Sequence, residues 1–154
     1  MISNQEHVAR VIFEPKMIYN GKLLVQAFDL RSHLHEDYLS VLRMVFEDWQ
    51  TDMLQIPTRK NRTVYGYAEM CVEEIRGIHL PLVEFDVRET DNSKMHSHAG
   101  IFVKVNNEPL VGGVKLSSLP KDVSEDFLLL AIKQQLTKLA QKGLRQINDP
   151  AVPR

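Results

Sequence analysis

The sequence predicts an α+β fold, in which a mostly antiparallel sheet built from hairpins packs with two long amphipathic helices. Three observations support this class: short segments of alternating apolar and polar residues, turn residues between them, and two longer segments with helical spacing. The strand segments mostly follow one another directly, which favours antiparallel pairing over repeated βαβ units. The length of 154 residues fits a single domain, 1–154.

The N-terminal region is expected to form a hairpin from strands at about residues 8–19 and 22–28. Asn20 and Gly21 lie between the two strands, and both tolerate the positive φ that a two-residue type I′ turn requires. Pro15 lacks a backbone N–H and is therefore expected to introduce a bulge or break in the first strand.

The first long helix is expected to begin near Asp37 and to end at Pro57. Its apolar residues recur at spacings of three and four, at Leu39, Leu42, Val45, Phe46, Trp49, Met53 and Leu54. A polar, basic loop over residues 57–63 follows. The segment 69–77 beyond it fits either a strand or a short helix.

The second half of the chain is expected to contain another antiparallel hairpin and the second long helix. The alternating segments 80–87 and 97–105 form the hairpin, and residues 108–116 form a further strand. Asp122 and Glu125 have capping-box spacing at the start of the helix, and Gly143 fits a C-terminal cap. The expected apolar face of this helix is Phe127, Leu130, Ala131, Leu136 and Leu139. Residues 146–154 are expected to be a loose tail.

Composition narrows the classes of function. The formal net charge of −1 removes the argument from strong basicity for a nucleic-acid-binding protein. The single cysteine, Cys71, excludes an intramolecular disulfide and a cysteine-rich zinc site. The chain shows neither a signal peptide nor an apolar run long enough for a membrane span, so we expect a cytoplasmic protein without a membrane partner.

The main candidate site is the segment His96-Ser97-His98 at the start of the second hairpin strand. Alternation places Ser97, Ala99 and Ile101 on the core face, and therefore both histidines on the opposite face. The preceding strand places Glu84, Asp86 and Arg88 on that same opposite face. Matching the two apolar faces predicts that His98 lies opposite Asp86 or Arg88, and that Glu84 or Asp86 lies opposite Gly100.

This predicted cluster has several interpretations. Two histidines with the carboxylates of Glu84 and Asp86 have the composition of a site for zinc or another divalent metal. A carboxylate beside an imidazole is also typical of a general base, which makes His98, His96 and Asp86 the candidate catalytic residues. Alternatively, the same face contacts a protein partner, or it is a solvated surface whose ion pairs contribute little.

His33 and His35 form a second His-x-His pair. Together the two pairs resemble the two His-x-Ser/Thr motifs of the 2H phosphoesterases, in which paired histidines act as acid and base. Neither pair places a hydroxyl two residues after its histidine, however, and a polar loop before a helix explains His33 and His35 equally.

The order "RVIF…IYNGKLLVQAFDL…LSV…SHAGI" resembles that of small uncharacterised bacterial proteins that carry an "aF…LSV" segment and a His-Ala strand. The resemblance covers about two thirds of the chain. It implies a bacterial setting and points to His98, and it implies no activity.

Two functional hypotheses follow from the sequence. The first is a small soluble binding or assembly module that acts through a protein partner or as a homo-oligomer, because the edges of a hairpin-built sheet can pair with another chain. It requires no cofactor. The alternative is a metal- or histidine-dependent hydrolase of a phosphodiester-type substrate, which uses the His96, His98 and Asp86 face.

Overall fold

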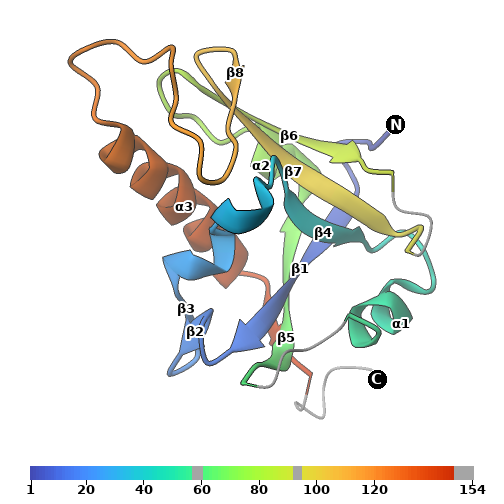
Figure 1. Cartoon of the computed structure of the whole chain (residues 1–154). Helices are drawn as coiled ribbons and strands as arrows, with labels where there is room; N and C mark the ends of the chain where they lie inside the picture. The colour runs from blue at the N-terminus through green and yellow to red at the C-terminus, as the bar shows by residue number, and fades with distance from the viewer. Residues whose placement is uncertain (57–60, 92–94, 148–154) are drawn as a thin grey trace.

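The computed structural model describes residues 1–56, 61–91 and 95–147, and it confirms the α+β class (Figure 1). Within these residues, seven strands form one antiparallel sheet in the order β6-β7-β4-β1-β5-β9, with β8 paired to β7. The strands are β1 (His7–Glu14), β4 (Leu39–Arg43), β5 (Thr63–Cys71), β6 (Val83–Glu89), β7 (His98–Val105), β8 (Glu108–Pro109) and β9 (Leu144–Gln146). Short strands β2 (Ile18–Tyr19) and β3 (Lys22–Leu23) form a separate hairpin.

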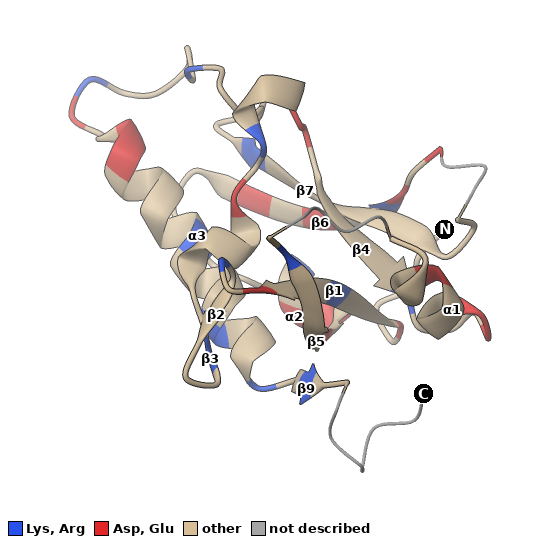
Figure 2. Cartoon of the chain, turned by 60° about the horizontal axis from the view of Figure 1, so that its bottom comes forward, with Lys and Arg blue, Asp and Glu red and all other residues tan. Residues whose placement is uncertain are grey.

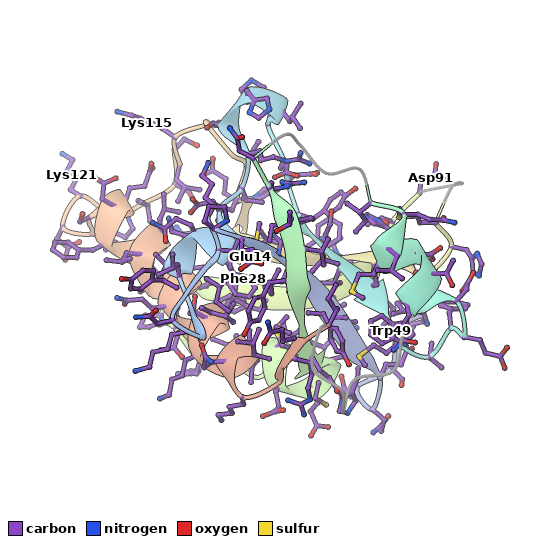
Figure 3. The ribbon with its side chains drawn as sticks, turned by 90° about the horizontal axis from the view of Figure 1, so that it is seen from below. Glu14, Phe28, Trp49, Asp91, Lys115 and Lys121 are labelled. Atoms are coloured by element: carbon purple, nitrogen blue, oxygen red, sulfur yellow. The ribbon has the colours of Figure 1, made fainter. Side chains whose placement is uncertain are left out.

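The helices lie on both faces of the sheet. They are α1 (Trp49–Leu54), α2 (Val72–Arg76) and α3 (Glu125–Gln141), with 3-10 helices η1 (Val25–Phe28) and η2 (Ser32–Leu34). The main core joins α3, through Ile132 and Leu136, to one face of the strands. A second, smaller core joins Trp49 and Met53 of α1 to the other face. α1 and α3 therefore lie on opposite sides of the sheet, and Trp49 is labelled on the side away from α3 in Figure 3.

The predicted first long helix is wrong. Its first part is β4, which lies between β1 and β7 in the sheet, and only Trp49–Leu54 is helical. Leu39 and Val41 are buried in the main core, whereas Leu42 belongs to the core on the opposite face. A central strand is buried on both faces, so its apolar residues do not simply alternate with polar ones. In this segment they fall at spacings that also fit a helix. Pro57, the expected end of the helix, lies outside the described residues.

Among the helices described, α3 is the long one, and it differs in detail from the prediction. Ser124 is its N-cap, accepting a hydrogen bond from the backbone N–H of Phe127 at 3.4 Å, in place of Asp122. Its first turn carries Glu125 and Asp126, drawn red in Figure 2. The buried face is Ile132, Leu136 and Ala140, and Phe127 is exposed. The buried face is therefore rotated from the expected one. Of the expected residues, Leu136 is buried and Leu139 packs against the main core partly buried.

Two predicted strands are much shorter than expected. Of 22–28 only Lys22–Leu23 is a strand and Val25–Phe28 is a 3-10 helix, and of 108–116 only Glu108–Pro109 is a strand. The predicted turn and break are confirmed. The Asn20–Gly21 turn joins β2 to β3 with positive φ at both residues. β1 ends at Glu14, immediately before Pro15. The ambiguous segment 69–77 contains both expected structures, because β5 runs to Cys71 and α2 begins at Val72. Residues 144–146 form β9 at the edge of the sheet, and the tail from residue 148 lies outside the described residues.

The edge of the sheet at β6 is covered by α2. Arg76 donates from Nε to Asp86 Oδ1 at 2.8 Å and from Nη2 to the carbonyl of Val87 at 2.9 Å. Asp86 Oδ1 also accepts from the backbone N–H of Val87 at 2.8 Å. Both outward backbone groups of Val87 are therefore occupied, which opposes pairing with another strand at this point.

Candidate functional site

The predicted β6–β7 hairpin is present, but its register differs from the expected one. The pairs include Glu84 with Lys104, Asp86 with Phe102 and Arg88 with Gly100. The parity is as predicted, since Val83, Phe85 and Val87 face the main core together with Val103 and Val105. However, the loop that joins β6 to β7 is longer than the expected pairing would require, since Glu89 pairs with Ala99. Neither Asp86 nor Arg88 lies opposite His98, and neither carboxylate lies opposite Gly100.

This register separates the residues of the predicted cluster. Phe102, the partner of Asp86, is four positions from His98, or about 13 Å along a strand. Asp86 instead binds Arg76, and Glu84 is exposed opposite Lys104. No group of three or more His, Cys, Asp or Glu side chains close enough to hold a metal occurs in the described parts of the chain. The structure does not bring Glu84, Asp86, His96 and His98 together.

His96 lies in the turn before β7 and points toward α1. Its Nε2 is 2.9 Å from Asp48 Oδ2, and its ring contacts Phe46 edge-on. The side chain is 66% exposed, so this contact is solvated and contributes little to stability.

Ser97 is the buried member of the His-Ser-His segment, as the alternation predicted. Its hydroxyl donates to Asp52 Oδ2 at 2.5 Å, and both side chains are buried. Asp52 belongs to α1, so this hydrogen bond fixes α1 against the start of β7. Because a buried carboxylate requires such a partner, Ser97 has a structural role.

His98 is partly buried on the opposite face of β7. Its Nδ1 is hydrogen-bonded to the hydroxyl of Thr90, and its ring lies edge-on to Tyr38, 5.9 Å between centroids. Burial lowers the pKa of His98 below its ordinary value, so the imidazole is neutral at pH 7.

His98 lines a cleft that opens in the sheet between β1 and β4. These two strands pair only at Val8–Arg43 and Ala9–Leu42, and beyond this point they diverge (Figure 1). The resulting cavity has a volume of about 680 Å³. Its charged and titratable lining residues are Arg10, Lys16, Asp29, Arg31, His33, Glu36, Arg62 and His98. Among the described residues of the lining, the four Lys and Arg side chains outnumber the two carboxylates, which gives this part of the cleft an excess of positive charge.

Arg10 is the central basic residue of the cleft. It occupies a position on β1 between the buried residues Val8 and Ile12. Its Nε and Nη2 donate to the carbonyl of Ala27 at 3.0 and 2.9 Å, and its Nη1 donates to the carbonyl of Ser40 at 2.8 Å. Arg10 thus bridges the two diverging strands.

The partners of Arg10 do not neutralise its charge. All three hydrogen bonds go to uncharged carbonyl groups, and no carboxylate of the described residues forms an ion pair with it. The pKa of the Arg10 guanidinium is lowered to about 10, chiefly by burial. The Glu36 carboxylate opposes this effect, and the positive charges of Arg31 and Arg62 add to it. The surroundings therefore disfavour the positive charge, which an anion would stabilise.

Both carboxylates of the cleft already have cationic partners. Glu36 accepts from the backbone N–H of Arg31 at 2.7 Å and from its Nη2 at 2.8 Å. Asp29 accepts from Lys133 of α3 at 2.8 Å. Arg62 lies over the ring of Phe13, 3.7 Å from the centroid. The positive charge of Arg10 is therefore not balanced by the cleft itself.

The second His-x-His pair is divided by the structure. His33 lines the cleft, whereas Nδ1 of His35 lies 3.1 Å from the carbonyl of Gly112. His35 has a positive φ of 46° at the end of η2. Only one histidine of each pair, His33 and His98, therefore lines the cleft.

The sequence contained a signal for the cleft that the histidine pattern obscured. Arg10 interrupts the apolar face of a strand, at an inward position between Val8 and Ile12. A charged residue there requires a partner or a functional reason. The other residues of the cleft come from separate segments, which only the tertiary structure brings together.

Within the described residues, none of the helices has the length and apolar composition needed to cross a membrane. Comparisons with protein-family models, with curated proteins and with solved structures found no match for this chain.

Proposed function

We propose that this protein binds a small anionic molecule, with a phosphate or carboxylate group, in the cleft between β1 and β4. The observation that carries the proposal is the environment of Arg10, whose hydrogen bonds all go to neutral carbonyl groups. The three hydrogen bonds leave two of its five N–H donors for another acceptor. An oxyanion fits this requirement, because a planar guanidinium binds phosphate and carboxylate groups with parallel hydrogen bonds.

The size and the charge of the cleft support the same proposal. Its volume of about 680 Å³ lies in the range of about 300–1,000 Å³ that is typical of small-molecule sites. Arg31 and Arg62 place further positive charge beside Arg10. The walls also include apolar side chains such as Val11, Phe13 and Leu42, which strengthen charge interactions by excluding water.

Titration with inorganic phosphate, pyrophosphate and citrate tests the proposal. We expect at least one of them to raise the melting temperature of the protein, because a ligand that binds only the folded state stabilises it. Arg62→Gln removes a charge from the cleft, and we expect it to weaken binding about tenfold to hundredfold, the range for a hydrogen bond to a charged group.

Arg10→Gln should have the same effect on binding, but it also removes hydrogen bonds that bridge β1 and β4, so Arg62→Gln is the cleaner variant. Arg145→Gln on β9 is the matched control, since Arg145 is exposed and does not line the cleft. The proposal fails if none of the anions binds. It also fails if the Arg62→Gln and Arg145→Gln variants both bind the anions as tightly as the unchanged protein does.

A hydrolase that acts on a phosphodiester is the second candidate, and the position of His98 favours it. His98 lines the anion cleft as a neutral imidazole. In the tautomer whose Nδ1–H donates to Thr90 Oγ1, Nε2 carries the lone pair that accepts a proton. His96 faces Asp48 outside the cleft. Dependence on a divalent metal remains a prediction, as does a protein partner or homo-oligomer.

The two histidines give this candidate a matched test. With bis(p-nitrophenyl) phosphate as substrate, we expect His98→Gln to lower the rate at least a hundredfold, which is typical for loss of a general base. His96→Gln should leave the rate unchanged. The rate should rise with pH through a pKa below about 6.5, because burial disfavours the protonated imidazole. Equal rates for the two variants would exclude His98 as the base.

A further inference from the structure

A second cavity lies between α3 and the main sheet. Its volume is about 340 Å³. Its apolar walls include Phe28 of η1, Leu39 of β4, Ile101 of β7, and Leu129 and Ile132 of α3, and the segment 110–115 also lines it. Five charged side chains complete the lining: Asp29, Asp37, Lys115, Glu125 and Lys133. A hydrocarbon against the apolar walls would gain dispersion contacts that water cannot supply there.

The apolar cavity adjoins the basic cleft. Asp29 and Leu30, which follow η1, line both cavities. On β4 the lining changes between consecutive residues, since Leu39 lines the apolar cavity and Ser40 lines the cleft. Ser40 is also the residue whose carbonyl accepts from Arg10. The oxyanion site and the apolar cavity therefore share Asp29 and Leu30 and meet at β4.

From this arrangement we infer that the ligand is amphipathic, with its anionic group at Arg10 in the cleft and a hydrocarbon chain in the apolar cavity. The anionic end of this ligand rests on the proposed function. The hydrocarbon end rests on the apolar cavity. The chain would pass along Asp29 and Leu30. Lys133 holds Asp29 at 2.8 Å, so the carboxylate at this passage is neutralised and does not repel the anion.

A series of phosphates with hydrocarbon chains of increasing length tests the inference. We expect the affinity, measured by titration calorimetry below the micelle concentration, to rise from inorganic phosphate through butyl phosphate to octyl phosphate. Burial of each methylene group should contribute about fourfold until the cavity is filled. Arg62→Gln should weaken the binding of all three phosphates.

Variants of α3 identify the position of the chain. Leu129→Trp places a larger side chain in the cavity, and we expect it to remove most of the gain from the octyl chain while leaving the affinity for inorganic phosphate unchanged. Leu129→Phe adds less volume and provides the same test if the tryptophan variant does not fold. Leu130→Trp is the control, because Leu130 is the next residue of α3 and does not line the cavity.

The outcomes separate the two proposals. Equal affinities for inorganic and octyl phosphate, both weakened by Arg62→Gln, would overturn the inference and leave the anion site intact. If the affinity rises with chain length but Arg62→Gln has no effect, the anionic group does not bind in the cleft. This result would overturn the proposed function. Equal effects of Leu129→Trp and Leu130→Trp would place the hydrocarbon outside the cavity and overturn the inference. Absence of binding by all three phosphates would overturn both proposals.

Discussion

Replacement of Glu6 by glutamine is expected to lower the free energy of unfolding by about 1.5–3 kcal/mol, the range for a hydrogen bond to a charged group, here in a partly buried pair. Glu6 binds Arg43 with two hydrogen bonds of 2.9 Å, from Nε to Oε1 and from Nη2 to Oε2. The two side chains are only 12% and 13% exposed. Glutamine would leave the partly buried Arg43 charge with one remaining carboxylate, Glu89, at 3.4 Å.

The position of this pair explains why the effect should be large. Arg43 belongs to β4, and Glu6 immediately precedes β1, so the pair closes the end of the sheet at which these strands are still hydrogen-bonded. The cleft opens beyond this point. Loss of the pair would therefore weaken the paired end of β1 and β4, which holds the two walls of the cleft together.

The pKa of Glu6 gives this prediction a pH dependence. The hydrogen bonds from Arg43 hold the pKa of the Glu6 carboxyl below its ordinary value. The folded state thus binds fewer protons than the unfolded state, and stability falls as the pH drops below the unfolded pKa of about 4.3 toward the folded one. The Glu6→Gln variant lacks this carboxyl group, so we expect its free energy of unfolding to fall less than that of the unchanged protein as the pH drops.

Urea denaturation at pH 7 and at acid pH measures both effects. Glu73→Gln on α2 is the matched control, because Glu73 is exposed. We expect the control to change the stability by less than about 0.5 kcal/mol, as is usual for surface substitutions. A similarly small effect of Glu6→Gln at pH 7 would show that the pair does not hold β4 to the N-terminal segment.

Leu136→Ala is expected to destabilise the protein by about 2–5 kcal/mol, the range observed for buried leucines. Leu136 is fully buried on α3, between Ile132 and Ala140 on the same helix face, and belongs to the main core. The substitution removes apolar burial and leaves a cavity that a long, packed helix cannot close by a small shift.

The same helix provides the control for this prediction. Leu130 is 38% exposed, so Leu130→Ala should cost much less than Leu136→Ala. Thermal unfolding followed by circular dichroism measures the difference, since about 1 kcal/mol corresponds to roughly 2–4 °C for a chain of this size. Equal effects of the two substitutions would contradict the orientation of α3 in the structure.

Local sequence signals predicted the parts of the fold that depend on neighbouring residues. The Asn20–Gly21 turn requires positive φ, which these residues tolerate at low cost. Pro15 lacks the N–H that a ladder uses, and β1 ends just before it. The alternation in 83–87 and 97–105 placed the correct side chains in the core, because the pleat has a period of two.

The register of the candidate hairpin could not be predicted in the same way. Parity restricts the pairing to steps of two residues, but the apolar faces match equally well at several of these steps. The structure pairs Asp86 with Phe102, and this shift separates the carboxylates from His98. The histidine site was therefore predicted on the correct face of the strand with the wrong neighbours.

The sequence by itself determined the α+β class, the turns and the faces of most strands, since these follow from backbone preferences and from side-chain periodicity over a few residues. Only the tertiary structure decided that Leu39–Arg43 is a central strand, because burial on both faces gives a strand the apolar spacing of a helix. It also decided the cleft. Arg10, Arg62 and His98 are far apart in the chain, and the divergence of β1 from β4 places them around one cavity.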